Sequence, residues 1–384
     1  MTAAHVQPAL IAWAAERSGR DRTLLEAKWP HYPEWLSGER QPSLADLEAF
    51  AKYTHAPFGY FFLPEPPEEP LPIPDFRTMA DRGLPARPSA DLLDTIYACQ
   101  LRQQWYRDYV QREELSRPDF VGSVAVGADV RTTAAAIVAT LSFDMERRAS
   151  LRGRDAVRAY LIKALEARGV LTTVTGTVGS DTHRLLNPEE FRGFTLFDPV
   201  APLVFVNGRD TTSAQIFTLV HEVAHVWAGD SGLSDADPFA RTSPDPERWA
   251  NRVAAEVLVP SDVLTHEYRG AVTPDELARL ADLFTVSSLV ILTSLHDGGH
   301  LGWDDYRRRY EDERRRLAEL AAERKPSSGG NYCNAQPYKV GGHPLVWAVV
   351  TDTLSGSTLY TDAYSLLGVS AHSTFEALAE KVLR

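Results

Sequence analysis

Cysteine is almost absent from this sequence. Only Cys99 and Cys333 occur among 384 residues, so neither a disulfide framework nor a cysteine-rich metal site can form. Two isolated thiols are typical of a reducing compartment, and we expect a cytoplasmic protein. No basic segment precedes the short apolar stretch at the N-terminus, so no signal peptide is predicted. The best membrane-helix candidate, Val286 to Leu295, is far shorter than the roughly 20 residues required.

Positive charge is also scarce. The chain has 40 Lys and Arg against 52 Asp and Glu, for a net charge of -12. Non-specific affinity for nucleic acid comes from many phosphate contacts by Lys and Arg, so a protein that coats DNA is excluded. A local basic patch is not excluded, because net charge describes bulk association and not one site.

Stretches rich in proline and glycine divide the chain. LPEPPEEPLPIPDF, residues 63–76, is expected to be a semi-rigid extended spacer, and Pro326-Ser-Ser-Gly-Gly marks a second boundary. The predicted organisation is a helix-turn-helix-like bundle at 1–63, a linker at 64–88, a helical connector at 89–149, a main domain with a helical subdomain at 150–325, and a small α+β appendage at 326–384.

Periodicity predicts a mostly helical α+β fold. Short strands are expected at Val170–Val174, Gly193–Phe197 and Leu203–Val206, and strong helices at Thr211–Ala228 and Pro246–Val259. Within the appendage, Pro344–Thr351 and Thr358–Tyr360 flank the turn Ser355-Gly356-Ser357, which predicts a β-hairpin.

The motif that carries chemistry is His221-Glu222-Val223-Ala224-His225. Two histidines four residues apart project from one helix face, so both imidazoles reach a single ion. Glu222 lies next to them, in place to act as general base toward an attacking water. The flanking residues are apolar, which suits a buried metal helix.

A third ligand is expected on the helix about twenty residues downstream. Catalytic zinc is commonly held by two His and one Glu, and Glu247 opens that helix with Asn251 four residues on, on the same face. Spacing alone leaves Asp245 and Glu256 as rival carboxylates. A structural zinc site would need four protein ligands, mostly Cys, and solvated surface histidines are the remaining alternative.

Several segments together resemble the ImmA/IrrE family of metallo-endopeptidases. They are FRGFTLFDPVAPLVFVN, FTLVHEVAHVWAG, SGLSD and ERWANRVAAEVLVP, within roughly residues 150–325. The resemblance implies a zincin-like core with a small sheet, Zn²⁺ held by His221, His225 and Glu247, and Glu222 as the catalytic base. It also implies a protein substrate, a transcriptional repressor cleaved in a stress or mobile-element response.

The N-terminal part resembles an Xre-type helix-turn-helix through IAWAAERSG and WLSGERQPSLADLEAFAKY. It departs from the pattern where the recognition helix is expected, because Pro30 and Pro33 leave room for only a very short helix. Acidic residues also outnumber basic ones there, whereas base edges are read by Arg, Lys, Asn or Gln. DNA is therefore a doubtful partner. The alternatives to a peptidase are a DNA-binding regulator with a metal site and an antitoxin-like binding protein.

Roles around the site stay open at this point. Asp230 is a candidate to orient a metal-binding histidine, although a solvated loop aspartate is the simpler interpretation. His183, His266 and Tyr268 are candidates to stabilise an oxyanion. An extended substrate could pair along the strand Leu203–Val206 if that strand lies at a sheet edge. The sequence carries no signal for an oligomeric state.

Overall fold

The computed structural model describes residues 5–75, 88–233, 245–323 and 337–383. The chain divides into two compact units. The first comprises Met1–Pro72 with Pro85–Ile96, and the second comprises Ile73–Leu84 with Tyr97–Arg384. The helix α5, Ala90–Arg112, contributes to both.

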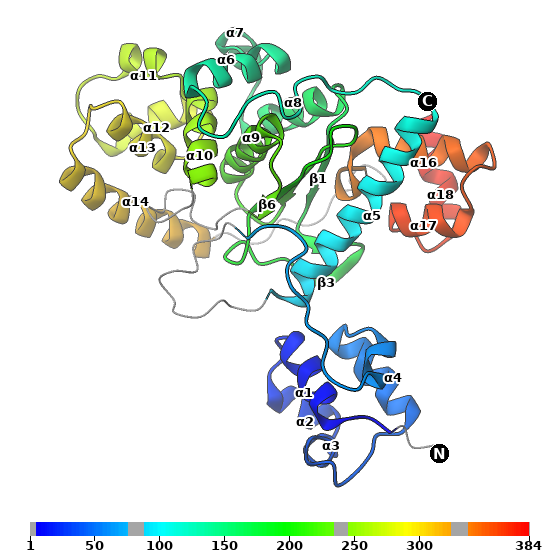
Figure 1. The fold of residues 1–384 in the computed structure, drawn as a ribbon. Helices are drawn as coiled ribbons and strands as arrows, with labels where there is room; N and C mark the ends of the chain where they lie inside the picture. The colour runs from blue at the N-terminus through cyan, green and yellow to red at the C-terminus, as the bar shows by residue number, and fades with distance from the viewer. Residues whose placement is uncertain (1–4, 76–87, 234–244, 324–336, 384) are drawn as a thin grey trace. The chain divides into compact units, whose positions relative to one another are not determined.

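The first unit is a small helical bundle (Figure 1). Its elements are α1 (Pro8–Arg17), α2 (Arg22–Lys28), α3 (Tyr32–Ser37), α4 (Leu44–Thr54) and the 3₁₀ helix η1 (Phe58–Phe62). The prediction of a very short helix after Pro30 is confirmed, because α3 has six residues and ends at Gly38 in the left-handed conformation. Its Tyr32 and Trp35 are buried and pack on Phe50.

The second unit is built on a four-stranded sheet in the order β1-β5-β4-β6. These strands are β1 (Leu171–Thr175), β4 (Gly193–Leu196), β5 (Leu203–Asn207) and β6 (Gly232–Leu233), and β2 (Thr177–Val178) forms a separate pair with β3 (Asp181–Leu185). The three predicted strands are confirmed. β5 pairs in parallel with β1 and antiparallel with β4, so the expectation of a free edge at Leu203–Val206 is wrong.

Helices cover this sheet and form the helical subdomain (Figure 1). They are α6 (Val130–Leu141), α7 (Met145–Ser150), α8 (Arg154–Glu166), α9 (Thr212–Ala228), α10 (Asp245–Leu258), α11 (Ser261–Glu267), α12 (Pro274–Leu283), α13 (Ser288–Asp297) and α14 (Trp303–Glu323). α9 contacts β4 and β5 and packs along α10. One continuous core of buried side chains joins these layers, and the mostly helical α+β class is confirmed.

The apolar stretch around α12 and α13 belongs to this core, where Leu280 and Ile291 are fully buried. Among the described residues, no single helix is long and apolar enough to cross a membrane. α12 and α13 meet that criterion only when taken together across a bend of 96°.

The C-terminal appendage is helical in its described part, and the predicted β-hairpin is wrong. It contains α16 (Gly342–Leu354), α17 (Tyr360–Leu367) and α18 (His372–Val382). The run after Pro344 is rich in β-branched residues, and periodicity cannot distinguish such a short apolar run from a buried helix. Leu345, Val346, Val349 and Val350 recur at helical spacing and are fully buried. The second predicted boundary, at 326–330, lies outside the described residues.

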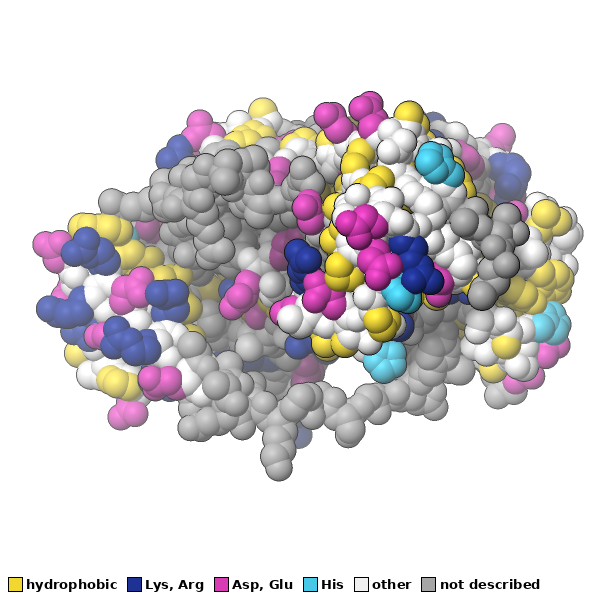
Figure 2. Space-filling view, turned by 90° about the horizontal axis from the view of Figure 1, so that it is seen from below, with side chains coloured by type: hydrophobic (Ala, Val, Ile, Leu, Met, Phe, Trp, Pro, Cys, Tyr) yellow, Lys and Arg dark blue, Asp and Glu magenta, His cyan; other side chains and the backbone are white. Residues whose placement is uncertain are grey.

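Charged side chains of both signs alternate along α14. Arg314 pairs with Glu311 at 2.8 Å, and Arg316 with Glu313 at 2.6 Å, each three residues away. On the coloured part of the face in Figure 2, basic and acidic side chains are likewise interspersed. This pattern is that of a solvated helix and does not provide a basic surface for nucleic acid.

Candidate metal centre

The helix α9 presents the two motif histidines inside the protein. Thr211 caps its N-terminus by accepting a hydrogen bond from the Ala214 amide, and Gly229 ends it in the left-handed conformation. Every residue from 215 to 227 is buried. His221 and His225 keep only 3% and 1% of their surface exposed, so the helix that carries the motif is embedded in the protein, as its apolar flanks predict.

A carboxylate from α10 meets these imidazoles. Glu247 is 1% exposed, and its two oxygens lie 3.3 Å from Nε2 of His221 and 3.0 Å from Nε2 of His225. The two Nε2 atoms are themselves 3.2 Å apart. Among the described residues, His221, His225 and Glu247 form the group whose ligand atoms all fall within 4.8 Å of one another.

This donor set fits a divalent metal. Two buried imidazole nitrogens converge on the same point as a buried carboxylate, and a dry site of this kind is stable only if the charges are paired or bind a metal. Two His and one Glu are the ligands found in catalytic zinc sites that leave a fourth position open. The residues present could therefore hold Zn²⁺, with three protein ligands.

The electrostatics of the metal-free group follow from the same contacts. Burial lowers the pKa of His221, but the Glu247 carboxylate, Glu222 and the Asn251 amide outweigh it and raise that pKa above its ordinary value. Burial raises the pKa of Glu247, but the two imidazoles together lower it by more, so the net shift of this pKa is downward. Glu247 is thus ionised, as a metal ligand must be.

Glu222 is fully buried and held by the neighbouring strand. The Thr195 hydroxyl of β4 lies 2.8 Å from the Glu222 carboxylate and 3.0 Å from the Glu222 carbonyl oxygen. A Cβ added at Gly193 would come within 2.7 Å of Oε1 of Glu222, so the strand approaches the carboxylate closely only because residue 193 is glycine. Sequence reasoning missed Thr195, since no motif marks it.

The rival and auxiliary residues lie as follows. Asp245 pairs with Arg248 on the surface, and Glu256 accepts hydrogen bonds from Ser261 at the start of α11. Asp230 places Oδ2 3.9 Å from Nδ1 of His225, which is ion-pair range but beyond hydrogen-bond distance.

The three oxyanion candidates lie on other elements. His183 is exposed on β3, and His266 is exposed on α11. Tyr268 follows α11 and packs against His300, with ring centroids 5.4 Å apart.

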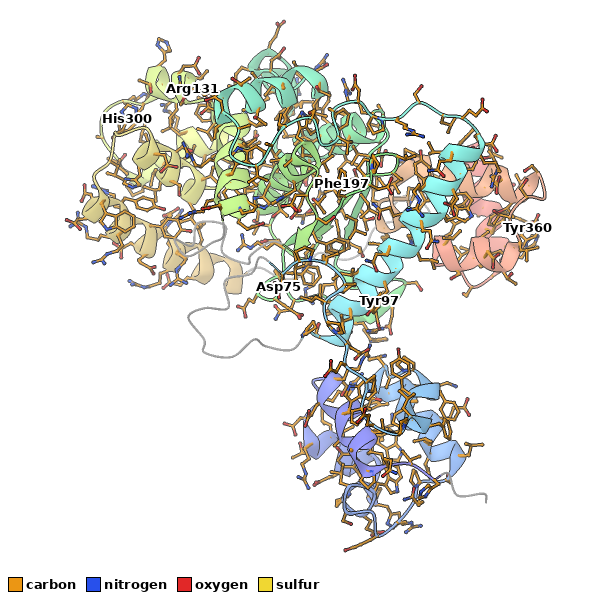
Figure 3. The ribbon with its side chains drawn as sticks, in the orientation of Figure 1. Asp75, Tyr97, Arg131, Phe197, His300 and Tyr360 are labelled. Carbon is orange, nitrogen blue, oxygen red and sulfur yellow. The ribbon has the colours of Figure 1, made fainter. Side chains whose placement is uncertain are left out.

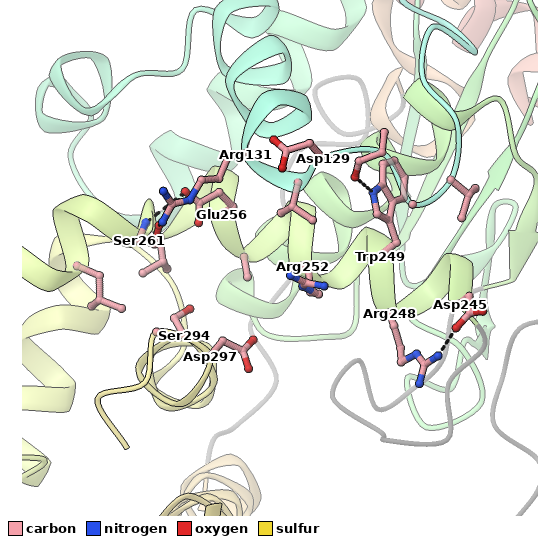
Figure 4. A pocket seen from close by; sticks show the side chains of 18 residues that line it. Asp129, Arg131, Asp245, Arg248, Trp249, Arg252, Glu256, Ser261, Ser294 and Asp297 are labelled. Atoms are coloured by element: carbon pink, nitrogen blue, oxygen red, sulfur yellow. Dashed lines mark hydrogen bonds and ion pairs between the residues drawn. The ribbon is translucent and has the colours of Figure 1, made fainter. Parts of the chain in front are cut away.

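A cavity of about 1000 Å³ lies on another face of α10 (Figure 4). Arg248 and Arg252 line it. They directly follow Glu247 and Asn251, the two residues of α10 that contact His221. None of the three candidate ligands is among its lining residues. Acidic Asp129, Asp245, Glu256 and Asp297 offset its three arginines, so its charge selects neither anions nor cations.

Comparison with known proteins agrees with this geometry. Residues 166–296 match the family model described as the IrrE N-terminal-like domain, a span that runs from the end of α8 into α13 and contains all three candidate ligands. Residues 342–381 match a domain of unknown function. No curated protein matches the chain. The core of this chain is therefore similar to metallopeptidases of the ImmA/IrrE family.

Proposed function

We propose that this protein is a zinc-dependent endopeptidase of the cytoplasm. The observation that carries the proposal is the convergence of His221, His225 and Glu247 within 4.8 Å in a fully buried position. The match of residues 166–296 to a metallopeptidase family supports it. We further propose, from the resemblance to that family, that the substrate is a regulatory protein, namely a transcriptional repressor.

The roles in hydrolysis follow from the contacts. Zn²⁺ bound by the three ligands would supply the positive charge that polarises the scissile carbonyl and favours ionisation of water. Glu222 accepts the proton from the attacking water and returns it to the leaving amine. The Thr195 hydroxyl, 2.8 Å from the Glu222 carboxylate, fixes the direction in which that carboxylate points. Burial of the group excludes bulk water and strengthens these interactions.

DNA binding by the first unit is a weaker candidate. Tyr32 and Trp35 of α3 are buried in the bundle, so they are not free to reach base edges. The half-buried Glu34 of the same helix pairs with Arg40, 3.6 Å away. A helix that reads DNA presents polar and basic side chains to the groove, and α3 does not.

The test measures zinc content and hydrolysis of fluorescein-labelled casein together. We expect about one zinc per wild-type chain, loss of both zinc and activity in His221→Ala, and retained zinc with at least about a 100-fold lower rate in Glu222→Gln. Glu146→Gln, an exposed glutamate on α7, is the control and should match the wild type. A wild-type protein that binds no zinc under metal-replete conditions would overturn the proposal.

A further inference from the structure

The sheet has one outer strand next to the candidate catalytic glutamate. β6 pairs with β4, with Gly232 opposite Thr195 and Leu233 opposite Phe194. Thr195 is the residue whose hydroxyl contacts Glu222, and Asp230, two residues before β6, lies 3.9 Å from the His225 imidazole. β6 is therefore tied at two points to the proposed active site.

Among the described residues, the other strands of this four-stranded sheet offer no such edge beside Glu222. β5 is paired on both sides. β1 lies at the far end of the sheet, where Thr172 forms an antiparallel bridge with Gly341. Extended peptides bind exposed sheet edges through main-chain hydrogen bonds, so within the described part of the chain β6 is the edge at which a substrate of this site would pair.

The chain itself occupies that edge. The Leu233 amide donates to the Pro74 carbonyl at 2.9 Å, and Asp75 forms a parallel bridge with Leu233; Figure 3 labels Asp75. Ile73, next in the same segment, is only 8% exposed. Residues 73–75, near the end of the Pro-rich stretch, thus bury one apolar side chain and fill one strand position.

We propose that residues 73–75 are a built-in competitor for the substrate edge of β6. The proposal rests on the proposed peptidase function. Parallel pairing is slightly less stable per residue than antiparallel pairing, and the bridge here involves a single residue pair. A substrate chain that pairs antiparallel with the two-residue strand β6 would have the more stable pairing geometry and would displace the segment. As long as the segment occupies the edge, only the fraction of molecules with a free edge can bind substrate. The apparent affinity is therefore the intrinsic affinity multiplied by that fraction.

The test weakens the segment through its buried anchor in the full-length chain. Ile73→Ser removes the apolar contact, and Ile73→Val is the matched control that keeps it. Since a competitor affects binding and not chemistry, KM for labelled casein should fall about tenfold in Ile73→Ser with kcat unchanged. Hydrogen exchange at the Leu233 amide should speed up in the same variant. The proposal would be overturned if the Leu233 amide of Ile73→Ser exchanged faster while KM stayed constant. It would also be overturned if exchange of that amide did not change in Ile73→Ser.

A binding measurement separates this proposal from the proposed function. Casein affinity is measured by fluorescence anisotropy in the Glu222→Gln background, which needs no hydrolysis. Tighter binding by Ile73→Ser, about tenfold, supports the competitor whether or not the wild type cleaves casein. Equal affinity with and without the Ile73 substitution, alongside normal cleavage by the wild type, would refute the competitor and leave the peptidase intact.

Discussion

Two regions of the second unit bury charged groups in opposite arrangements. At the α9–α10 contact, the ligand atoms of His221, His225 and Glu247 converge on one point. Where the C-terminal helices meet the core, the charges are spread out. Arg102 donates to the Leu366 carbonyl at 2.9 Å, and Glu166 accepts from the His343 amide at 3.3 Å.

The difference teaches how to interpret buried charge. A buried group that has hydrogen-bond partners of its own, as Arg102 and Glu166 have, is compatible with a purely structural role. In the metal-free group the two imidazole nitrogens, 3.2 Å apart, can satisfy each other only by sharing a proton, whereas one divalent ion would bind both of them and Glu247 at once. Convergence, and not burial alone, therefore marks the candidate metal site.

The largest expected effect concerns the convergent group. Glu247→Gln keeps the shape but removes the charge that offsets the metal, and we expect zinc affinity to fall by more than the 10–100-fold typical of losing an outer partner. Glu256→Gln is the control, because this glutamate lies on the same helix and caps α11. Zinc titration against a chromophoric chelator measures both. Equal losses in the two variants would remove Glu247 from the site.

How much of this site the sequence predicts follows from helix geometry. The spacing of four residues brings His221 and His225 to one face whatever the rest of the fold does. The position of Glu247 needed the family resemblance, because spacing left Asp245 and Glu256 open. Thr195 could not be found, since its contact with Glu222 depends on how β4 packs on α9, and that is a tertiary property.

The fold shows the same division between local and long-range information. Three core strands and the helices around the site were predicted from periodicity. β6 was not, because a strand of two residues has no pattern to detect. β5 is central because it pairs in parallel with β1, about thirty residues earlier in the chain. The residues of a strand do not reveal which distant strand it pairs with, so this strand order could not be predicted from the sequence pattern. Pro344–Thr351, which lies in α16, was misread as a strand, because β-branched residues are compatible with either structure when buried.

A smaller effect is expected at Gly193, the glycine that lies against the proposed catalytic carboxylate of Glu222. In Gly193→Ala the new Cβ would lie 2.8 Å from the Phe205 carbonyl and 2.6 Å from Cγ2 of Thr218, so β4 must shift away from its neighbours. We expect a loss of about 1–3 kcal/mol in unfolding free energy together with reduced casein hydrolysis. Gly59→Ala, at a position where nothing lies within 4 Å, should change stability by about 0.5 kcal/mol or less. Denaturant unfolding measures the stability of both variants, and casein hydrolysis measures their activity. A Gly193→Ala variant with wild-type stability would contradict the close approach of β4 to Phe205 and Thr218.

The smallest effect on the candidate metal centre is expected from the separate contacts of the second region. Arg102→Met keeps the volume of a fully buried side chain but leaves the Leu366 carbonyl without its donor, which costs about 1–3 kcal/mol. Arg107→Met on the same helix breaks only a partly exposed pair with Asp198, worth about 1 kcal/mol or less. Zinc content should remain at the wild-type level in both, because neither side chain belongs to the convergent group.

The opposite result would be that Arg102→Met loses zinc while it remains folded under native conditions. The contact between Arg102 and Leu366 would then be coupled to the candidate metal centre. The separation between structural and functional buried charge would fail for this protein.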